Sequence, residues 1–247
     1  MTRFWLAAAW VMLAASQSPL TSIDVLDGTR DRRIPVAIYQ QGAPTKPAIL
    51  SHGYGARNTD YGFIANHLAA RGYLVVSIQH ELPGDAPLPS TGKPYDARMP
   101  SWQQGAESIR VVLGEMETRY PALDYTQLLL VGHSHGGDTS MLFAREWPDL
   151  ARAVISLDSR RMPFPRTARP QLFTIRSSDQ QPDPGVLPPP AERAALGLRS
   201  VTLPATVHDD MWDGATPAQK AEILAHIDEF LAELERVHGA LALPPRP

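Results

Sequence analysis

The sequence predicts an α/β fold in which a mostly parallel central sheet is covered by helices on both faces. Short apolar runs alternate along the chain with segments of helical period, and such alternation is typical of parallel strands joined by helical crossovers. A length of 247 residues allows one large domain or two small ones. Because no internal repeat and no change of composition divides the chain, we interpret it as one domain.

The expected elements follow from these runs in chain order. Strands are predicted at 34–39, 47–50, 73–78, 128–131, 153–157, 171–175 and 200–203. Helices are predicted at 61–71, 101–120, 139–147 and 217–237, the first closed by Gly72 and the last opened by Thr216 and Pro217. Two stretches rich in proline are expected to be long loops that overhang the site, 81–100 and 182–190.

Composition excludes several classes of function. The chain has 23 Lys and Arg against 26 Asp and Glu, a net charge of −3, which argues against a nucleic-acid or anionic-membrane surface. It has no cysteine, so disulfide frameworks, thiolate zinc sites, a cysteine nucleophile and a lipidated N-terminal cysteine are all excluded.

The first residues have the layout of a secretory signal peptide. Arg3 precedes an unbroken apolar run at 4–15, and small residues follow up to Ser16. The run is shorter than the ~20 residues that span a bilayer. We therefore expect residues 1–16 to be cleaved, residues 17–247 to form the domain, and the mature protein to be periplasmic or secreted without stable membrane insertion.

A nucleophile is expected at Ser134. The predicted strand at 128–131 runs into Gly132-His-Ser134-His-Gly136, and a helix follows. Gly-x-Ser-x-Gly between a strand and a helix is the pattern of a sharp turn that lifts a serine hydroxyl clear of a sheet. The glycines lack the Cβ atoms that would collide across such a turn.

An oxyanion hole is expected beside this serine. An acyl-transfer enzyme needs two preorganised N–H donors for the tetrahedral oxyanion. The backbone N–H groups of His135, directly after the serine, and of Tyr54, in the His-Gly-Tyr-Gly turn at 52–55, suit this role.

The general base is expected to be His208, which follows the last predicted strand in chain order. An acid must orient and stabilise its imidazolium. Asp158 and Asp179 each follow a strand between Ser134 and His208, so both satisfy the order serine, acid, histidine. Position alone leaves these two alternatives open.

Four stretches together resemble the α/β-hydrolase superfamily, namely residues 47–55, 68–76, 132–137 and 157–165. More narrowly, they resemble the branch of platelet-activating-factor acetylhydrolases, chlorophyllases and cutinase-like polyester hydrolases. The resemblance implies an α/β-hydrolase fold without a large cap domain, a carboxylic-ester hydrolase, and no cofactor, zinc or nucleotide. In the acetylhydrolase-like members the acid lies in a Leu-Asp segment before a Met/Phe-Pro stretch, which favours Asp158 over Asp179. The chain departs from its polyester-cleaving relatives, which commonly carry a disulfide.

The resulting hypothesis is a monomeric serine esterase for small to medium acyl esters, acting through an acyl-serine intermediate. A peptidase of the same fold and a non-catalytic binding protein on that fold are the alternatives. A metal hydrolase built on His133 and His135 is a third, weaker alternative. The two side chains flank the serine and are expected to point apart. Aromatic and sulfur-containing residues are candidates for an acyl pocket: Tyr54, Met99, Trp102, Met211 and Trp212.

Overall fold

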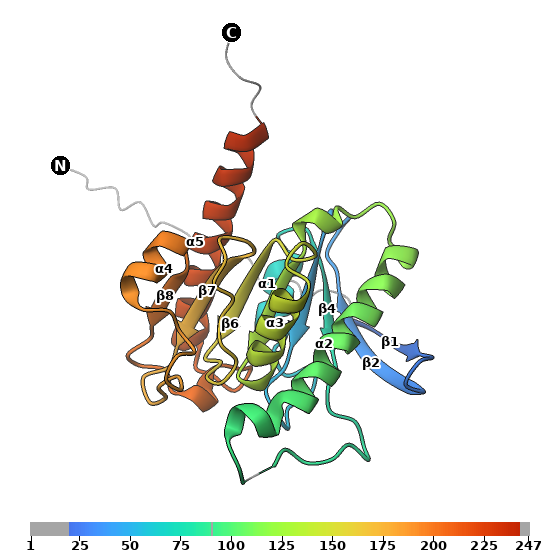
Figure 1. Cartoon of the computed structure of the whole chain (residues 1–247). Coiled ribbons are helices and arrows are strands. Elements are labelled where there is room, and N and C mark those ends of the chain that lie inside the picture. The colour runs from blue at the N-terminus through green and yellow to red at the C-terminus, as the bar shows by residue number, and fades with distance from the viewer. Residues whose placement is uncertain (1–19, 90, 243–247) are drawn as a thin grey trace, which may run out of the picture.

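Eight strands form one twisted sheet at the centre of the protein (Figure 1). The computed structural model describes residues 20–89 and 91–242, with side chains up to residue 236, so the predicted signal peptide lies outside the described residues. The sheet order is β1-β2-β4-β3-β5-β6-β7-β8. The strands are β1 Leu20–Asp27, β2 Arg32–Tyr39, β3 Lys46–Ser51, β4 Tyr73–Ile78, β5 Leu129–His133, β6 Ala153–Leu157, β7 Gln171–Arg176 and β8 Arg199–Thr202. Strands β3 to β8 run parallel, and β2 is antiparallel to both β1 and β4.

Helices cover both faces of this sheet. They are α1 Gly62–Ala69, α2 Pro94–Arg119, α3 His135–Glu146, α4 Pro190–Leu196 and α5 Pro217–Ala242. Two apolar cores result, one beneath α2 and α3 and the other beneath α1 and α5. Figure 1 shows α3 in front of the sheet and α1 behind it. Within the described part of the chain, no helix is long and apolar enough to cross a membrane.

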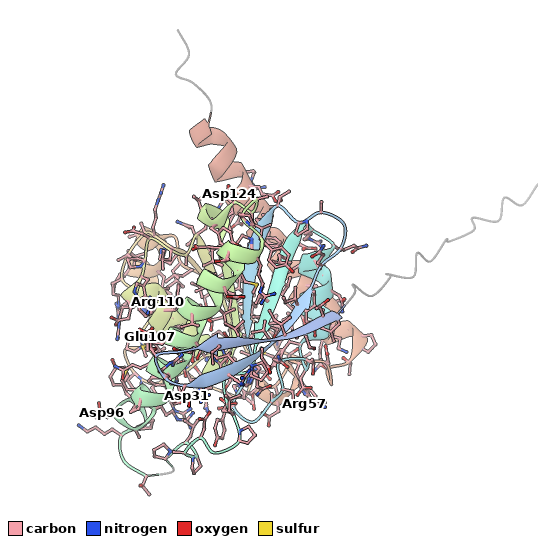
Figure 2. All side chains as sticks on the ribbon, turned by 90° about the vertical axis from the view of Figure 1, so that its right-hand side faces the viewer. Asp31, Arg57, Asp96, Glu107, Arg110 and Asp124 are labelled. Atoms are coloured by element: carbon pink, nitrogen blue, oxygen red, sulfur yellow. The ribbon has the colours of Figure 1, made fainter. Side chains whose placement is uncertain are left out.

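The buried faces of the helices, rather than their charged faces, hold these layers together. Figure 2 shows Asp96, Glu107 and Arg110 along the outer side of α2, where Arg110 pairs with Glu107 at 2.9 Å. An exposed pair of this kind contributes less than about 1 kcal/mol. By contrast, Trp102 and Ile109 on the inner side of α2 are fully buried, and burying one such side chain contributes about 1.5–3 kcal/mol.

The predicted strands and the predicted parallel sheet are confirmed, and so is the cap of the last helix. Thr216 Oγ accepts a hydrogen bond from the N–H of Gln219 at 3.3 Å, and Gln219 Oε1 accepts one from the N–H of Thr216 at 2.9 Å. This reciprocal pair satisfies two backbone donors at the start of α5.

Residues 94–100 were wrongly assigned to a loop, because α2 begins at Pro94 and passes through Pro100. Pro94 stands at the first helical position, where a missing N–H costs nothing. Tyr95 and Met99 pack against the core, and this packing outweighs the backbone hydrogen bond that Pro100 removes. Residues 81–93 remain without a helix or strand in the described part of the segment.

Strand β1 and helix α4 were missed by sequence reasoning. Strand β1 lies at the sheet edge, where only Val25 and Asp27 are buried, so it lacks the apolar run of a central strand. Helix α4 begins at Pro190, within the stretch that its prolines marked as a loop, and buries none of its residues.

Candidate active site

The turn between β5 and α3 places Ser134 in a strained backbone conformation, with φ 50° and ψ −115°. A Cβ on Gly132 would lie 2.4 Å from the carbonyl oxygen of Gly136, and one on Gly136 would lie 2.3 Å from that of Ser51. Backbone atoms cannot move aside as flexible side chains can, so both positions require glycine. The N–H of Ser134 donates to Leu157 O at 2.8 Å, which fixes the turn to the end of β6.

Parallel strands bring three predicted residues together at their carboxyl ends. Ser134 Oγ lies 3.0 Å from His208 Nε2, and His208 Nδ1 lies 2.6 Å from Asp158 Oδ2. An ionised carboxylate only accepts hydrogen bonds, so Nδ1 must donate to Asp158 and leave Nε2 free to accept from the serine hydroxyl. This arrangement can remove a proton from Ser134.

The carboxylate of Asp158 is fully buried yet well supplied with donors. Arg176 lies 2.8 Å from Oδ1, and Ser177 donates through its N–H to Oδ1 at 3.1 Å and through its hydroxyl to Oδ2 at 2.7 Å. Burial by itself raises the pKa of Asp158, but the bond from His208, the charge of Arg176 and the bonds from Ser177 outweigh it and hold the pKa below its ordinary value. The group therefore stays charged.

The alternative acid, Asp179, lies elsewhere. Its Oδ1 accepts the backbone N–H of His208 at 2.8 Å, and the residue is exposed. Asp179 thus fixes the main chain of the histidine loop, while Asp158 contacts the imidazole ring. The structure brings Asp158, not Asp179, into the contact that an orienting acid needs.

The two expected oxyanion donors lie in the turns that follow β3 and β5, which are neighbouring parallel strands. Tyr54 follows β3, and His135 is the first residue of α3, beyond reach of an intrahelical acceptor. Among the described residues, neither backbone N–H takes part in a hydrogen bond. Free donors at a helix N-terminus favour developing negative charge.

Tyr61 and His133, which sequence reasoning did not place in the site, contact its residues. The hydroxyl of Tyr61 accepts the N–H of Gly53 at 3.0 Å and lies 2.7 Å from His133 Nδ1. The ring of His133 packs against that of His208, with centroids 4.8 Å apart. Burial, with a smaller effect of His208, lowers the pKa of His133 to about 3, so His133 places no second charge beside the ring of His208. The position of His133 inside the Gly-x-Ser-x-Gly motif was the signal that could have indicated this role.

The other histidine of the motif faces a different neighbourhood. His135 Nδ1 accepts from the indole N–H of Trp102 at 3.0 Å, and its Nε2 lies 3.0 Å from Ser101 Oγ. His133 and His135 therefore contact different partners on opposite sides of the turn. Among the described residues, no three His, Cys, Asp or Glu side chains are grouped so that they could hold a metal ion.

A cavity of about 230 Å³ adjoins the site, lined by Tyr54, His135 and parts of the segment 81–104. Part of the Pro-rich segment 81–100 thus lines a cavity beside the candidate site, whereas no residue of the other Pro-rich stretch, 182–190, is among the residues that line it. Of the five candidate pocket residues, Tyr54 alone is among those that line this cavity. Trp102 and Met211 are fully buried instead. Sequence reasoning missed His80 and Glu81, which do line it.

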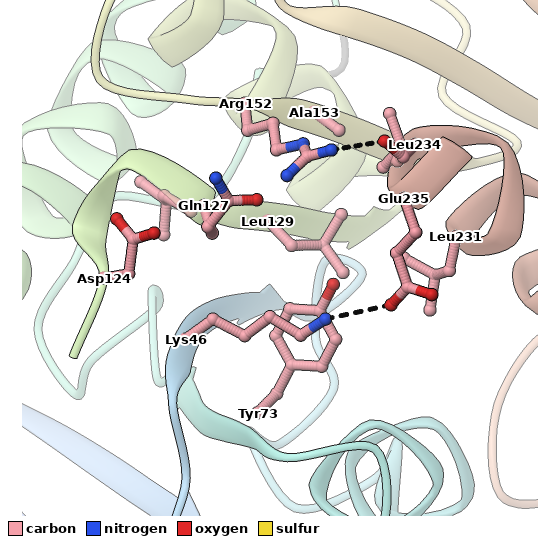
Figure 3. A pocket seen from close by; sticks show the side chains of 11 residues that line it. Lys46, Tyr73, Asp124, Gln127, Leu129, Arg152, Ala153, Leu231, Leu234 and Glu235 are labelled. Carbon is pink, nitrogen blue, oxygen red and sulfur yellow. Dashed lines mark hydrogen bonds and ion pairs between the residues drawn. The ribbon is translucent and has the colours of Figure 1, made fainter. Parts of the chain in front are cut away.

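A second cavity, of about 330 Å³, lies at the opposite edge of the sheet (Figure 3). Lys46, Tyr73 and Leu129 line it at or near the starts of their strands. Figure 3 shows Lys46 paired with Glu235, at 3.2 Å. Because Ser134 and its partners stand at the carboxyl ends of the strands, this cavity does not belong to their site.

Comparison with known proteins gives one family match and several similar structures. Residues 42–158 match the family described as serine aminopeptidase, S33. A ferulic acid esterase from Streptomyces cinnamoneus is 19% identical, with 89% of this chain and 90% of that chain covered and a TM-score of 0.63. An esterase from Rhizomucor miehei is 13% identical, covering 92% and 85%, with a TM-score of 0.67. A dienelactone hydrolase-like promiscuous phosphotriesterase from metagenomic libraries is 15% identical, covering 89% and 99%, with a TM-score of 0.68.

Proposed function

We propose that this chain, which has the α/β-hydrolase fold, is a serine hydrolase that cleaves carboxylic esters. The observation that carries the proposal is the continuous series of contacts from Ser134 through His208 to Asp158, at 3.0 and 2.6 Å. The esterases among the similar structures support it. We further propose the narrower placement in the branch of acetylhydrolases, chlorophyllases and cutinase-like polyester hydrolases, on the basis of the stretches 47–55, 68–76, 132–137 and 157–165.

The first half-reaction forms an acyl-serine. Ser134 Oγ attacks the carbonyl carbon of the ester while its proton passes to His208 Nε2. The carbonyl oxygen becomes an oxyanion, which the N–H groups of Tyr54 and His135 stabilise. The intermediate collapses, the C–O bond to the alcohol breaks, and His208 gives its proton to the leaving oxygen.

The second half-reaction uses water in place of the alcohol. Water donates a proton to His208 Nε2 and attacks the acyl carbon, and collapse releases the acid and returns the proton to Ser134. Asp158 keeps its charge throughout and stabilises the imidazolium that forms in each half. Loss of the hydrogen bond between Asp158 and His208 should therefore lower the rates of both half-reactions.

Esters of small and medium acids are the expected substrates. The cavity beside the oxyanion donors measures about 230 Å³, and a wall of Pro-rich loop and helix borders it. In a series of p-nitrophenyl esters, kcat/KM should be highest for short acyl chains, fall as the chain lengthens, and show no increase when the substrate forms an emulsion. Preference for long acyl chains with activation at the emulsion surface would contradict this expectation.

A peptidase is the second candidate, because the matched family is described as serine aminopeptidase. The same nucleophile, base and oxyanion donors can cleave an amide. Aminoacyl p-nitroanilides measured beside the esters distinguish the two. The proposal predicts that the esters are turned over and the anilides are not, and the reverse pattern would replace esterase by peptidase.

We also propose export from the cytoplasm, on the basis of the apolar run at 4–15. Cleavage after Ser16 should leave a mature protein that begins near Gln17. N-terminal sequencing of the protein recovered from outside the cytoplasm measures this directly. An intact Met1 on the folded, soluble protein would contradict export by a cleaved signal peptide.

A further inference from the structure

Two polar atoms beside the candidate oxyanion hole have no hydrogen-bond partner. His80 and Glu81 follow β4 and line the cavity of about 230 Å³ that Tyr54 and His135 border. Within the described part of the chain, His80 Nδ1 and Glu81 Oε1 are buried and make no hydrogen bond. A buried polar atom without a partner is costly, so such a pair at a cavity indicates a ligand that supplies the missing bonds.

The hydrogen bond with Ser51 determines which ring nitrogen of His80 carries the proton. The fully buried Ser51 hydroxyl makes its hydrogen bond with His80 Nε2, at 2.9 Å, and has no other acceptor among the described residues. The Ser51 hydroxyl must therefore donate its hydrogen bond to Nε2 of His80. Burial, with smaller effects of His52 and His135, holds the pKa of His80 well below its ordinary value. A neutral ring that accepts at Nε2 carries its proton on Nδ1, so His80 presents a free donor.

Glu81, the next residue in the chain, presents a free acceptor at Oε1. Its Oε2 accepts the N–H of Gly55 at 3.2 Å, while Oε1 has no partner. Both carboxylate oxygens of the neighbouring Asp85 already accept hydrogen bonds from Arg32, at 2.6 Å each. Burial raises the pKa of Glu81 to about 7, and a donor supplied by a ligand would favour the charged carboxylate.

Gly105, in α2, carries no side chain where it faces His80 Nδ1. A Cβ at Gly105 would lie 3.3 Å from His80 Nδ1 and 2.7 Å from the methyl group of Thr139. Gly105 therefore leaves the side of His80 Nδ1 that faces α2 free of a side chain, and it also allows α2 to approach Thr139 of α3 closely. Gly114, on the same helix, has no atom within 4 Å of its corresponding position.

The position of the cavity relative to His208 indicates which half of an ester it would receive. The leaving alcohol must lie against His208 Nε2, which protonates it. His208 and its loop do not line the cavity, whereas both oxyanion residues do. A substrate held at the oxyanion hole would thus direct its acyl chain, not its alcohol, into this cavity.

We propose that the cavity is an acyl subsite that recognises a hydroxyl group on the acyl chain, so that the preferred substrates are esters of hydroxy acids. The proposal rests on the esterase function proposed above. The hydroxyl accepts a hydrogen bond from His80 Nδ1 and donates one to Glu81 Oε1. A plain alkyl chain leaves both atoms unpaired, an ammonium group cannot accept from His80, and a carboxylate is repelled by Glu81.

The test compares kcat/KM for ethyl esters by titration of the acid released. The series contains ethyl butanoate, its 2-, 3- and 4-hydroxy derivatives, and ethyl 3-aminobutanoate. The best hydroxy ester should exceed ethyl butanoate by about tenfold or more, because the analogue without the hydroxyl leaves buried groups unpaired. Equal kcat/KM for all the hydroxy esters and ethyl butanoate, or a preference for the amino ester, overturns the proposal while the esterase function stands. Absence of turnover with every ester contradicts the esterase function itself.

Variants locate the preference in this cavity. Gly105→Ala fills the space before His80, and Glu81→Gln replaces the acceptor while keeping an oxygen for Gly55. In both, the ratio of kcat/KM for hydroxy ester over plain ester should fall toward 1, and in the matched control Gly114→Ala it should stay at the wild-type value. Circular dichroism verifies folding, and Glu81→Gln keeps the test valid if Gly105→Ala does not fold. A ratio that Glu81→Gln leaves unchanged overturns the assignment.

Discussion

Replacing Ser134 by alanine is expected to lower kcat for a short-chain ester by about 10⁶-fold, the loss typical of a deleted serine nucleophile. Without Oγ, no acyl-enzyme can form, and the residual rate comes from the oxyanion donors and substrate binding alone. A discontinuous assay with high enzyme concentration measures this small residue. Activity within 100-fold of wild type would remove Ser134 from the mechanism.

The strained backbone of Ser134 supplies the folding control for that experiment. Alanine keeps the Cβ, so Ser134→Ala should unfold at nearly the same denaturant concentration as wild type. Glycine adopts φ 50° without penalty, and relief of strain at such a position contributes about 1–3 kcal/mol. Ser134→Gly should therefore be more stable than Ser134→Ala and equally inactive. Equal stability of the two variants would contradict the strained turn.

Replacing Asp158 by asparagine is expected to lower kcat by about 10⁴-fold with KM little changed. The amide cannot stabilise the imidazolium of His208, and its NH₂ group favours the wrong tautomer. Asparagine tolerates a positive φ, such as the 51° at this position. Because Arg176 loses a buried carboxylate partner, chemical unfolding should accompany the kinetics so that lost stability is not mistaken for lost catalysis.

Asp179→Asn is the matched control for the acid. The residue is exposed, and asparagine keeps an oxygen that can accept the N–H of His208. Its kcat should fall less than about tenfold, because a retained hydrogen bond to the backbone preserves the loop without altering the charge at the ring. A larger loss in Asp179→Asn than in Asp158→Asn would show that the acid is wrongly assigned, whatever the role of Ser134.

The strand, turn and helix around Ser134 could be predicted because local chemistry determines them. Gly132 and Gly136 meet backbone atoms within the turn itself and in the adjacent β3, and the apolar run before them specifies a buried strand. Parallel strands then bring their carboxyl ends to one edge, which places Asp158 and His208 near the serine without any knowledge of side-chain packing. Chain order alone left Asp179 open because both acids follow neighbouring strands.

The supporting residues and the cavity could not be predicted, because they depend on contacts between distant segments. Tyr61 reaches Gly53 and His133 only once α1 packs behind the sheet. The free donor of His80 depends on Ser51 in another strand and on the close approach of Gly105 in α2. Likewise, the first turns of α2 are fixed by tertiary packing of Tyr95 and Met99, which overrode the loop-like composition.

The central claim, that Ser134 is the nucleophile, is tested most directly by labelling with a fluorophosphonate and locating the adduct by tandem mass spectrometry. The reagent forms a covalent bond with an activated serine, and trypsin releases Ser134 within the peptide 120–145. We predict a single adduct on Ser134 whose formation parallels the loss of ester hydrolysis, with no labelling of Ser134→Ala. Complete loss of activity with the adduct on another residue, or full activity with Ser134 labelled, would contradict the account.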